Sequence, residues 1–102
     1  MDFDKAFGKA VRDIRISRGL TQEFFTDISS RTHISRLELG QSGATLNFIN
    51  KIAAALNVHP LTIISLAYLN TGNITDLSEL QNVVKKDIQT LASKELQALI
   101  KD

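Results

Sequence analysis

Apolar residues recur at steps of three and four along most of this chain, in short stretches separated by turn-forming residues. The first stretch predicts an amphipathic helix over residues ~3–18. Its apolar face consists of Phe3, Phe7, Ala10, Val11 and Ile14. Strands need a period of two, which the chain does not sustain, and one proline and five glycines in 102 residues leave few breaks. The pattern therefore predicts an all-α fold.

Capping residues mark where the next two helices begin and end. Thr21 suits the N-cap of a second helix over residues ~22–28, and Ser29 or Ser30 suits the N-cap of a third. Gly40 follows the third helix, where a glycine commonly ends a helix in the left-handed conformation. The predicted third helix is short and mostly polar.

The remaining helices are predicted in the same way. Thr45 caps a fourth helix, Pro60 opens a fifth, and Asp76 with Glu79 has the spacing of a capping box. Ser93 can start another turn of helix. The fourth helix has the stripe Leu46, Ile49, Ile52, Ala53 and Leu56, and the later helices are expected over residues ~60–70 and ~76–91.

Composition excludes several classes of protein. The chain has no cysteine, so disulfides and thiolate chemistry are absent, and we expect a cytoplasmic protein. Its two histidines, His33 and His59, have no ligand-spaced companions, and no nucleophile motif is present. We therefore expect neither an enzyme nor a metal or cofactor site. The uncharged run 52–75 is interrupted by Asn57 and Pro60, which excludes a membrane span.

The net charge is only +1, but the charges are unevenly distributed. All five arginines lie in the first 36 residues, and Lys51 is the single formal charge between Leu39 and Thr75. This pattern predicts a contact surface at the front of the chain, a core or self-association segment in the middle and a solvated helix at the end.

Three stretches together resemble the Cro/repressor-like (XRE-type) helix-turn-helix family. They are RGLTQEFF, then ISRLELG, then TLNFINKIAAALNV, and the resemblance covers residues ~5–69. It implies a five-helix, lambda-repressor-like DNA-binding domain over residues 1–70. Residues 71–102 would then form a C-terminal helical extension that serves as a dimerisation element.

A helical wheel separates the faces of the third helix. At about 100° per residue, Ile34 and Leu37 share the buried direction, and Thr32 points away from it. The outward face is expected to read base edges in the major groove. Its members are Thr32, Ser35 and Arg36, and Arg31 can swing in from the N-terminal turn of the helix to join them.

The resemblance also implies contacts to the DNA backbone and one internal ion pair. The residues assigned to phosphates are Thr21, Gln22, Ser30, His33, Gln41 and Ser42. Such contacts position a protein on DNA without reading its sequence. In this family an arginine at the position of Arg15 ties the first helix to a glutamate, here Glu38. The spacing from Leu20 to Ile34 is two residues shorter than the family pattern, which affects the register of the third helix.

The fifth and last helices carry more apolar side chains than a domain of this size is expected to bury. A symmetric dimer would cover the excess. The residues predicted to form its interface are Leu61, Leu66, Tyr68, Leu69, Leu77, Leu80, Val84 and Ile88. We therefore expect a homodimeric, sequence-specific transcriptional regulator that binds a pseudo-palindromic operator and acts as a repressor rather than as an activator. Two alternatives are an antitoxin that holds a toxin through its C-terminal helix, and a helical adaptor without DNA binding.

Overall fold

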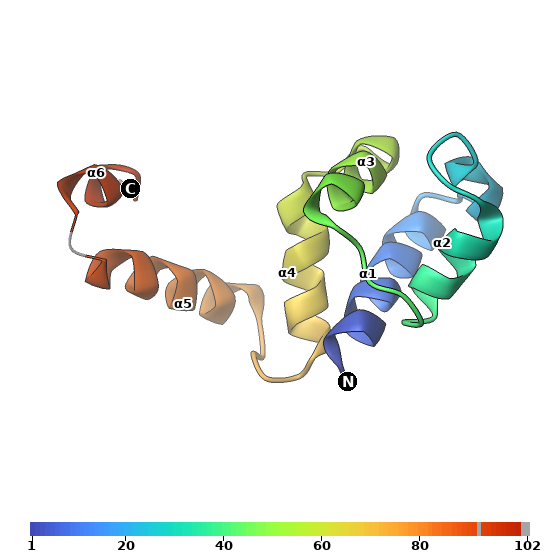
Figure 1. Ribbon diagram of the computed structural model, residues 1–102. Helices are drawn as coiled ribbons and strands as arrows, with labels where there is room; N and C mark the ends of the chain where they lie inside the picture. The colour runs from blue at the N-terminus through green and yellow to red at the C-terminus, as the bar shows by residue number, and fades with distance from the viewer. Residues whose placement is uncertain (92, 101–102) are drawn as a thin grey trace.

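The computed structural model describes residues 1–91 and 93–100, and these residues form helices and turns only. The elements are α1 (Phe3–Ser17), the single 3₁₀ turn η1 (Gln22–Phe25), α2 (Arg31–Glu38), α3 (Leu46–Leu56), α4 (Pro60–Asn70), α5 (Leu77–Thr90) and α6 (Lys94–Ala98). The predicted all-α class is confirmed. Figure 1 shows the first five elements packed together and the last two extending away from them.

Most of the predicted helix boundaries are confirmed by capping hydrogen bonds. The Ser30 hydroxyl accepts from the His33 N–H at 3.1 Å, and the Thr45 hydroxyl accepts from the Phe48 N–H at 3.1 Å. Before Pro60, the His59 ring caps α4 by accepting from a backbone N–H. These bonds satisfy donors that the first turn of a helix leaves without partners.

The second helix is shorter than predicted. Only Gln22–Phe25 is helical, as one 3₁₀ turn, and the Thr21 side chain makes no capping hydrogen bond. The prediction of a helix over 22–28 with Thr21 as a side-chain cap is therefore wrong. The reason is the shortened connection. The chain must turn back within residues 26–29 to bring Ser30 to the start of α2, which leaves no residues for further helical turns.

The core lies where α1, α2, α3 and α4 meet, and α1 packs most extensively against α4. The largest fully buried side chains are Val11, Phe25, Ile34, Leu37, Ile52, Leu56 and Ile63. Leu46, which we placed on the buried stripe of α3, is instead 71% exposed. It is the first residue of that helix, so it extends past the end of the core.

The C-terminal helices form an arm. The Asp76 carboxylate caps α5 by accepting from the Glu79 N–H. Both the hydroxyl and the N–H of Thr75 donate to the Glu79 carboxylate and lower its pKa below the usual value.

The radius of gyration is 15.4 Å, against about 13 Å for a compact domain of this length. The arm accounts for the excess.

Candidate nucleic-acid interface

Helix α2 is held by its apolar side and leaves its polar side exposed. Ile34 and Leu37 are completely buried in the core. Arg31, Thr32 and Arg36 are exposed, as the helical wheel predicts. Ser35 is only half-buried, so its hydroxyl has less freedom than those three side chains. The arrangement presents the N-terminal turn of a short helix and one polar face to the surroundings.

A bidentate ion pair fixes α2 to α1. Arg15 Nε and Nη2 donate to the two carboxylate oxygens of Glu38, each at 2.8 Å. A third nitrogen, Arg15 Nη1, donates to the carbonyl of Leu20 at 2.8 Å, in the connection between α1 and η1. Hydrogen bonding to Glu38 is the main reason why the pKa of Arg15 lies above its usual value. Glu38 is buried, and Arg15 covers its carboxylate.

Gln22 joins the same network. Its side-chain nitrogen donates to Glu38 Oε1 at 3.1 Å, so in this structure it braces η1 against α2. The amide nitrogen carries two N–H groups, and only one of them is needed for the bond to Glu38. The expected phosphate contact can therefore use the second N–H while the first stays on Glu38.

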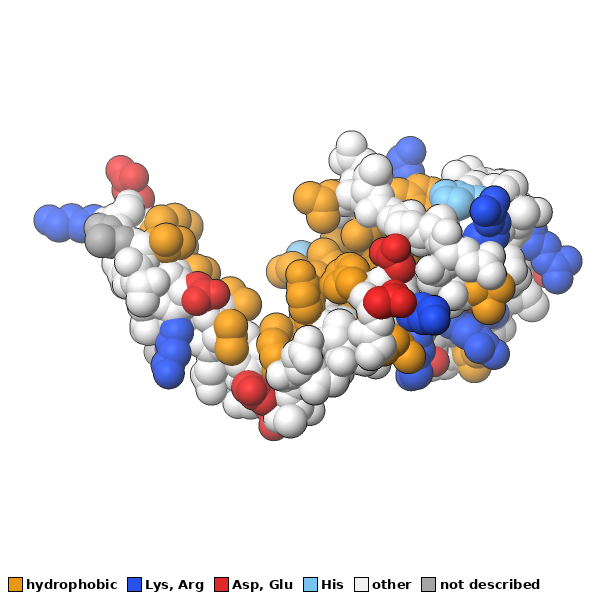
Figure 2. Space-filling view, turned by 60° about the horizontal axis from the view of Figure 1, so that its bottom comes forward, with side chains coloured by type: hydrophobic (Ala, Val, Ile, Leu, Met, Phe, Trp, Pro, Cys, Tyr) orange, Lys and Arg blue, Asp and Glu red, His pale blue; other side chains and the backbone are white. Residues whose placement is uncertain are grey.

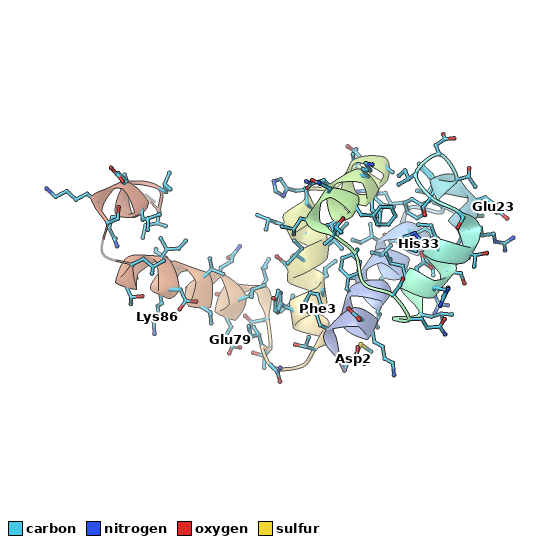
Figure 3. All side chains as sticks on the ribbon, viewed as in Figure 1. Asp2, Phe3, Glu23, His33, Glu79 and Lys86 are labelled. Atoms are coloured by element: carbon cyan, nitrogen blue, oxygen red, sulfur yellow. The ribbon has the colours of Figure 1, made fainter. Side chains whose placement is uncertain are left out.

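Glu23 is a functional candidate that the sequence reasoning missed. Its carboxylate lies 3.0 Å from Arg31 Nη1, and both side chains are more than half exposed. Figure 3 shows Glu23 at the outer end of the helix-turn-helix region, on the η1 side. The shortened connection brings the two residues together, since η1 must pass close to the start of α2. The spacing from Leu20 to Ile34, two residues shorter than the family pattern, was the sequence signal from which this contact could have been predicted.

The other predicted phosphate contacts differ in their exposure. Ser30 and Gln41 are exposed at the two ends of α2. His33 is half-buried, with Nδ1 2.6 Å from the Ser29 hydroxyl and its ring 5.1 Å from that of Phe48. The Ser42 hydroxyl oxygen is buried and makes no hydrogen bond within the described residues. Among these four, the geometry therefore supports Ser42 least.

Two glycines allow α1 and α2 to approach closely, and the sequence analysis did not identify this role. A Cβ on Gly8 would contact the backbone of Leu37 and would lie 2.7 Å from the Glu38 carbonyl oxygen. A Cβ on Gly40 would lie 2.7 Å from the Cα of Lys5, and Gly40 also has a φ of +76°. The approach positions α2 so that the Arg15–Glu38 pair can form.

Comparison with known proteins decides the family. The helix-turn-helix family model HTH_3 matches residues 11–63, which are 53 of the 102 residues. The chain belongs to the Cro/repressor-like helix-turn-helix family. This family assignment makes the chain a DNA-binding transcriptional regulator rather than an enzyme.

A solved structure is similar to part of the chain. It is the restriction-modification controller protein C.AhdI from Aeromonas hydrophila, with 31% sequence identity and a TM-score of 0.55. The similarity covers 58% of this chain and 92% of that one. No curated protein sequence matches the chain closely enough to count as a relative.

Beyond the helix-turn-helix elements, α4 and α5 form the two sides of an apolar groove of about 790 Å³. Six of the eight predicted dimer residues line this groove. The groove contains Leu61, Tyr68, Leu77, Leu80, Val84 and Ile88, whereas Leu66 packs against the core and neither Leu66 nor Leu69 lines the groove. Figure 2 shows hydrophobic side chains along the hollow between the arm and the rest of the molecule.

Within residues 1–91 and 93–100 there is no group of three or more His, Cys, Asp or Glu side chains that could hold a metal ion. In the same residues no single helix is long and apolar enough to cross a membrane. The helices Leu46–Leu56 and Pro60–Asn70 are long and apolar enough only when they are taken together, and the chain bends by 106° between them.

Proposed function

We propose that this protein is a homodimeric regulator that binds a pseudo-palindromic operator in the cytoplasm and represses transcription, including that of its own gene. The observation that carries the proposal is the polar, outward face of α2 on a helix whose opposite side is completely buried. In helix-turn-helix proteins such a helix enters the major groove, with its N-terminal residues at base edges. The similarity to a restriction-modification controller protein supports a regulatory role of the same kind.

We assign base reading to Arg31, Thr32, Ser35 and Arg36. An arginine can donate two hydrogen bonds to one guanine, and threonine can bond a base or contact the thymine methyl group. Thr21, Gln22, Ser30, His33, Gln41 and Ser42 are proposed to position the backbone, with Ser42 the weakest member. Ser30 lies at the N-terminus of α2, where free N–H groups favour a phosphate.

We assign dimerisation to the extension 71–102 together with the outer face of α4. A two-fold dimer would place two α2 helices about one turn of DNA apart, ~34 Å, so the operator would contain two inverted half-sites. The exposed apolar face of α5 also favours a second candidate, an antitoxin-type regulator whose extension holds a different protein. In that case the extension of a single copy would bind the other protein, and it would not pair with a second copy of this chain.

Selection of binding sites from random DNA tests the proposed function directly. We expect enriched sequences with two inverted half-sites, and an affinity that falls steeply with salt because Lys and Arg displace condensed counterions from phosphates. Single half-sites would contradict the dimeric mode of binding. No enrichment at low salt would contradict DNA reading by this chain and favour the adaptor.

Arg36→Ala is expected to weaken binding to the selected operator by about 1–3 kcal/mol, which is roughly 5- to 150-fold, and to relax base preference at one position in each half-site. The side chain is exposed and lies outside the hydrophobic core, so the melting temperature should not change. Filter binding on a set of single-base operator variants measures both effects. Lys51→Ala is a matched control, since Lys51 is an exposed cation on α3. A uniform loss on all the operators would indicate a phosphate contact instead.

Glu23→Gln is expected to raise affinity for non-specific DNA severalfold. The substitution removes a carboxylate that pairs with Arg31 and would otherwise repel nearby phosphates. The exposed pair contributes only about 0–1 kcal/mol to stability, so unfolding should be almost unchanged. Competition between operator and random DNA measures the change in discrimination. Unchanged binding to both DNAs would mean that Glu23 lies away from the duplex.

A further inference from the structure

The apolar face of α5 has a symmetry that a second copy of the same helix would match. The stripe consists of Leu77, Leu80, Val84 and Ile88 of α5 and of Leu91, the C-cap residue that follows the helix. Their positions are symmetric about Val84, with offsets of four and seven residues on each side. At 100° per residue they fall within a stripe about 80° wide. A two-fold axis through Val84 would therefore superimpose this stripe on itself in the reverse direction.

The stripe is only partly covered within the chain, where Leu80 and Ile88 are half-buried. None of the described residues of α5 is buried, and Leu77, Val84 and Leu91 are 48%, 50% and 54% exposed. The polar side chains Glu79, Asn82 and Lys86 occupy the opposite side of the helix by the same wheel, and Figure 3 shows Glu79 and Lys86 pointing away from α4. The arm thus presents its apolar stripe to the groove, and Glu79 and Lys86 lie on its outer side.

The amount of apolar surface is close to what a stable dimer needs. Leu61 and Tyr68 on α4 and Val83 on α5 are also between 42% and 60% exposed. The same holds for the three stripe residues above, Leu77, Val84 and Leu91. With on the order of 150–200 Å² for each large side chain, the exposed parts of these six side chains amount to roughly 500 Å² of apolar surface per copy. A standard interface buries about 800 Å² per partner, of which somewhat more than half is apolar. An isologous interface must be self-complementary, and this stripe meets that condition.

We propose that α5 pairs antiparallel with α5 of a second copy, about a two-fold axis at Val84, and that each α5 enters the groove of the other copy. Val84 then faces its equivalent, Leu80 faces Ile88 of the partner subunit, and Leu77 faces Leu91 of the partner subunit. This inference rests on the proposed dimeric function and specifies its interface. The smallest residue of the stripe lies at the centre, where two helices 8–10 Å apart come closest.

The absence of cysteine from the sequence allows a direct test by disulfide formation. A Val84→Cys protein should form a covalent dimer under mild oxidation, because facing Cα atoms of packed helices lie within the 4.4–6.8 Å that a disulfide requires. Leu77→Cys alone should not, since the two equivalent positions would lie roughly 20 Å apart along the antiparallel helices. A mixture of Leu77→Cys and Leu91→Cys proteins should form the mixed dimer. Asn82→Cys, on the outer side of α5, is the matched control.

Non-reducing gels and sedimentation equilibrium of the unmodified chain together separate the outcomes. Efficient linkage of Leu77→Cys alone would show parallel helices and overturn the proposal. A dimer in sedimentation with no linkage at Val84→Cys would also overturn it, while leaving a dimeric regulator with a different interface. A monomer in sedimentation that still binds single half-sites would overturn both the pairing and the proposed dimer. In that case the groove would belong to another part of this chain or to a different protein.

Discussion

Arg15→Ala is expected to lower the free energy of unfolding by about 3–5 kcal/mol, because it leaves the buried Glu38 carboxylate without its cationic partner. The substitution also removes the donor to the Leu20 carbonyl. For a domain with a total stability of about 5–15 kcal/mol, such a loss is large enough to unfold part of the population at 37 °C. Chemical denaturation followed by circular dichroism measures it. DNA binding would fall as a consequence of unfolding.

Two further variants separate the ion pair from general effects of charge. Arg18→Ala removes an exposed arginine near the end of α1 and should change stability by no more than about 0.5 kcal/mol. The double variant Arg15→Met, Glu38→Leu should be more stable than Arg15→Ala, since no charge remains buried. If Arg15→Ala instead retained full stability and lost only DNA affinity, Arg15 would have to act at the DNA.

Gly8→Ala is expected to destabilise the protein by about 3 kcal/mol, because the added methyl group would overlap backbone atoms that cannot rotate away. The overlap is with Leu37 and Glu38 at the end of α2. Alanine favours a helix over glycine by about 1 kcal/mol, so helix propensity alone predicts the opposite sign. The sign of the change in the denaturation midpoint therefore tests the close approach of α1 and α2.

Gly43→Ala is the control for the glycine substitution. A Cβ on Gly43 would lie 3.4 Å from a carboxylate oxygen of Asp4, which is an ordinary contact with a movable side chain. We expect a change within about 0.5 kcal/mol. If Gly8→Ala proved as neutral as Gly43→Ala, the two helices would be further apart than the structure places them.

The sequence predicted the elements whose signals are local. The hydroxyls of Ser30 and Thr45 cap the helices that follow them, and Ile34 and Leu37 are buried on the side that the helical period indicates. A cap is decided by three or four adjacent residues, and a buried stripe by the geometry of one helix. Neither depends on what the rest of the chain does.

Features that depend on two distant segments could not be predicted in the same way. A Gly8 in the interior of a helix resembles any unfavourable glycine until α2 is placed against it. The contact between Glu23 and Arg31 exists because a short connection brings η1 to the start of α2. The same connection reduced the predicted second helix to one turn. Base contacts, operator symmetry and the partner of α5 depend on molecules other than this chain.

The shortness of α2 has a consequence for how such a protein responds to temperature. An isolated peptide of eight residues is not helical in water, so α2 keeps its shape only while α1 and η1 hold it. The fraction of molecules able to occupy an operator therefore cannot exceed the fraction whose core is folded. Heat-sensitive alleles should accordingly arise at interior positions such as Ile34 and Gly8, far more readily than at the exposed residues that touch the bases.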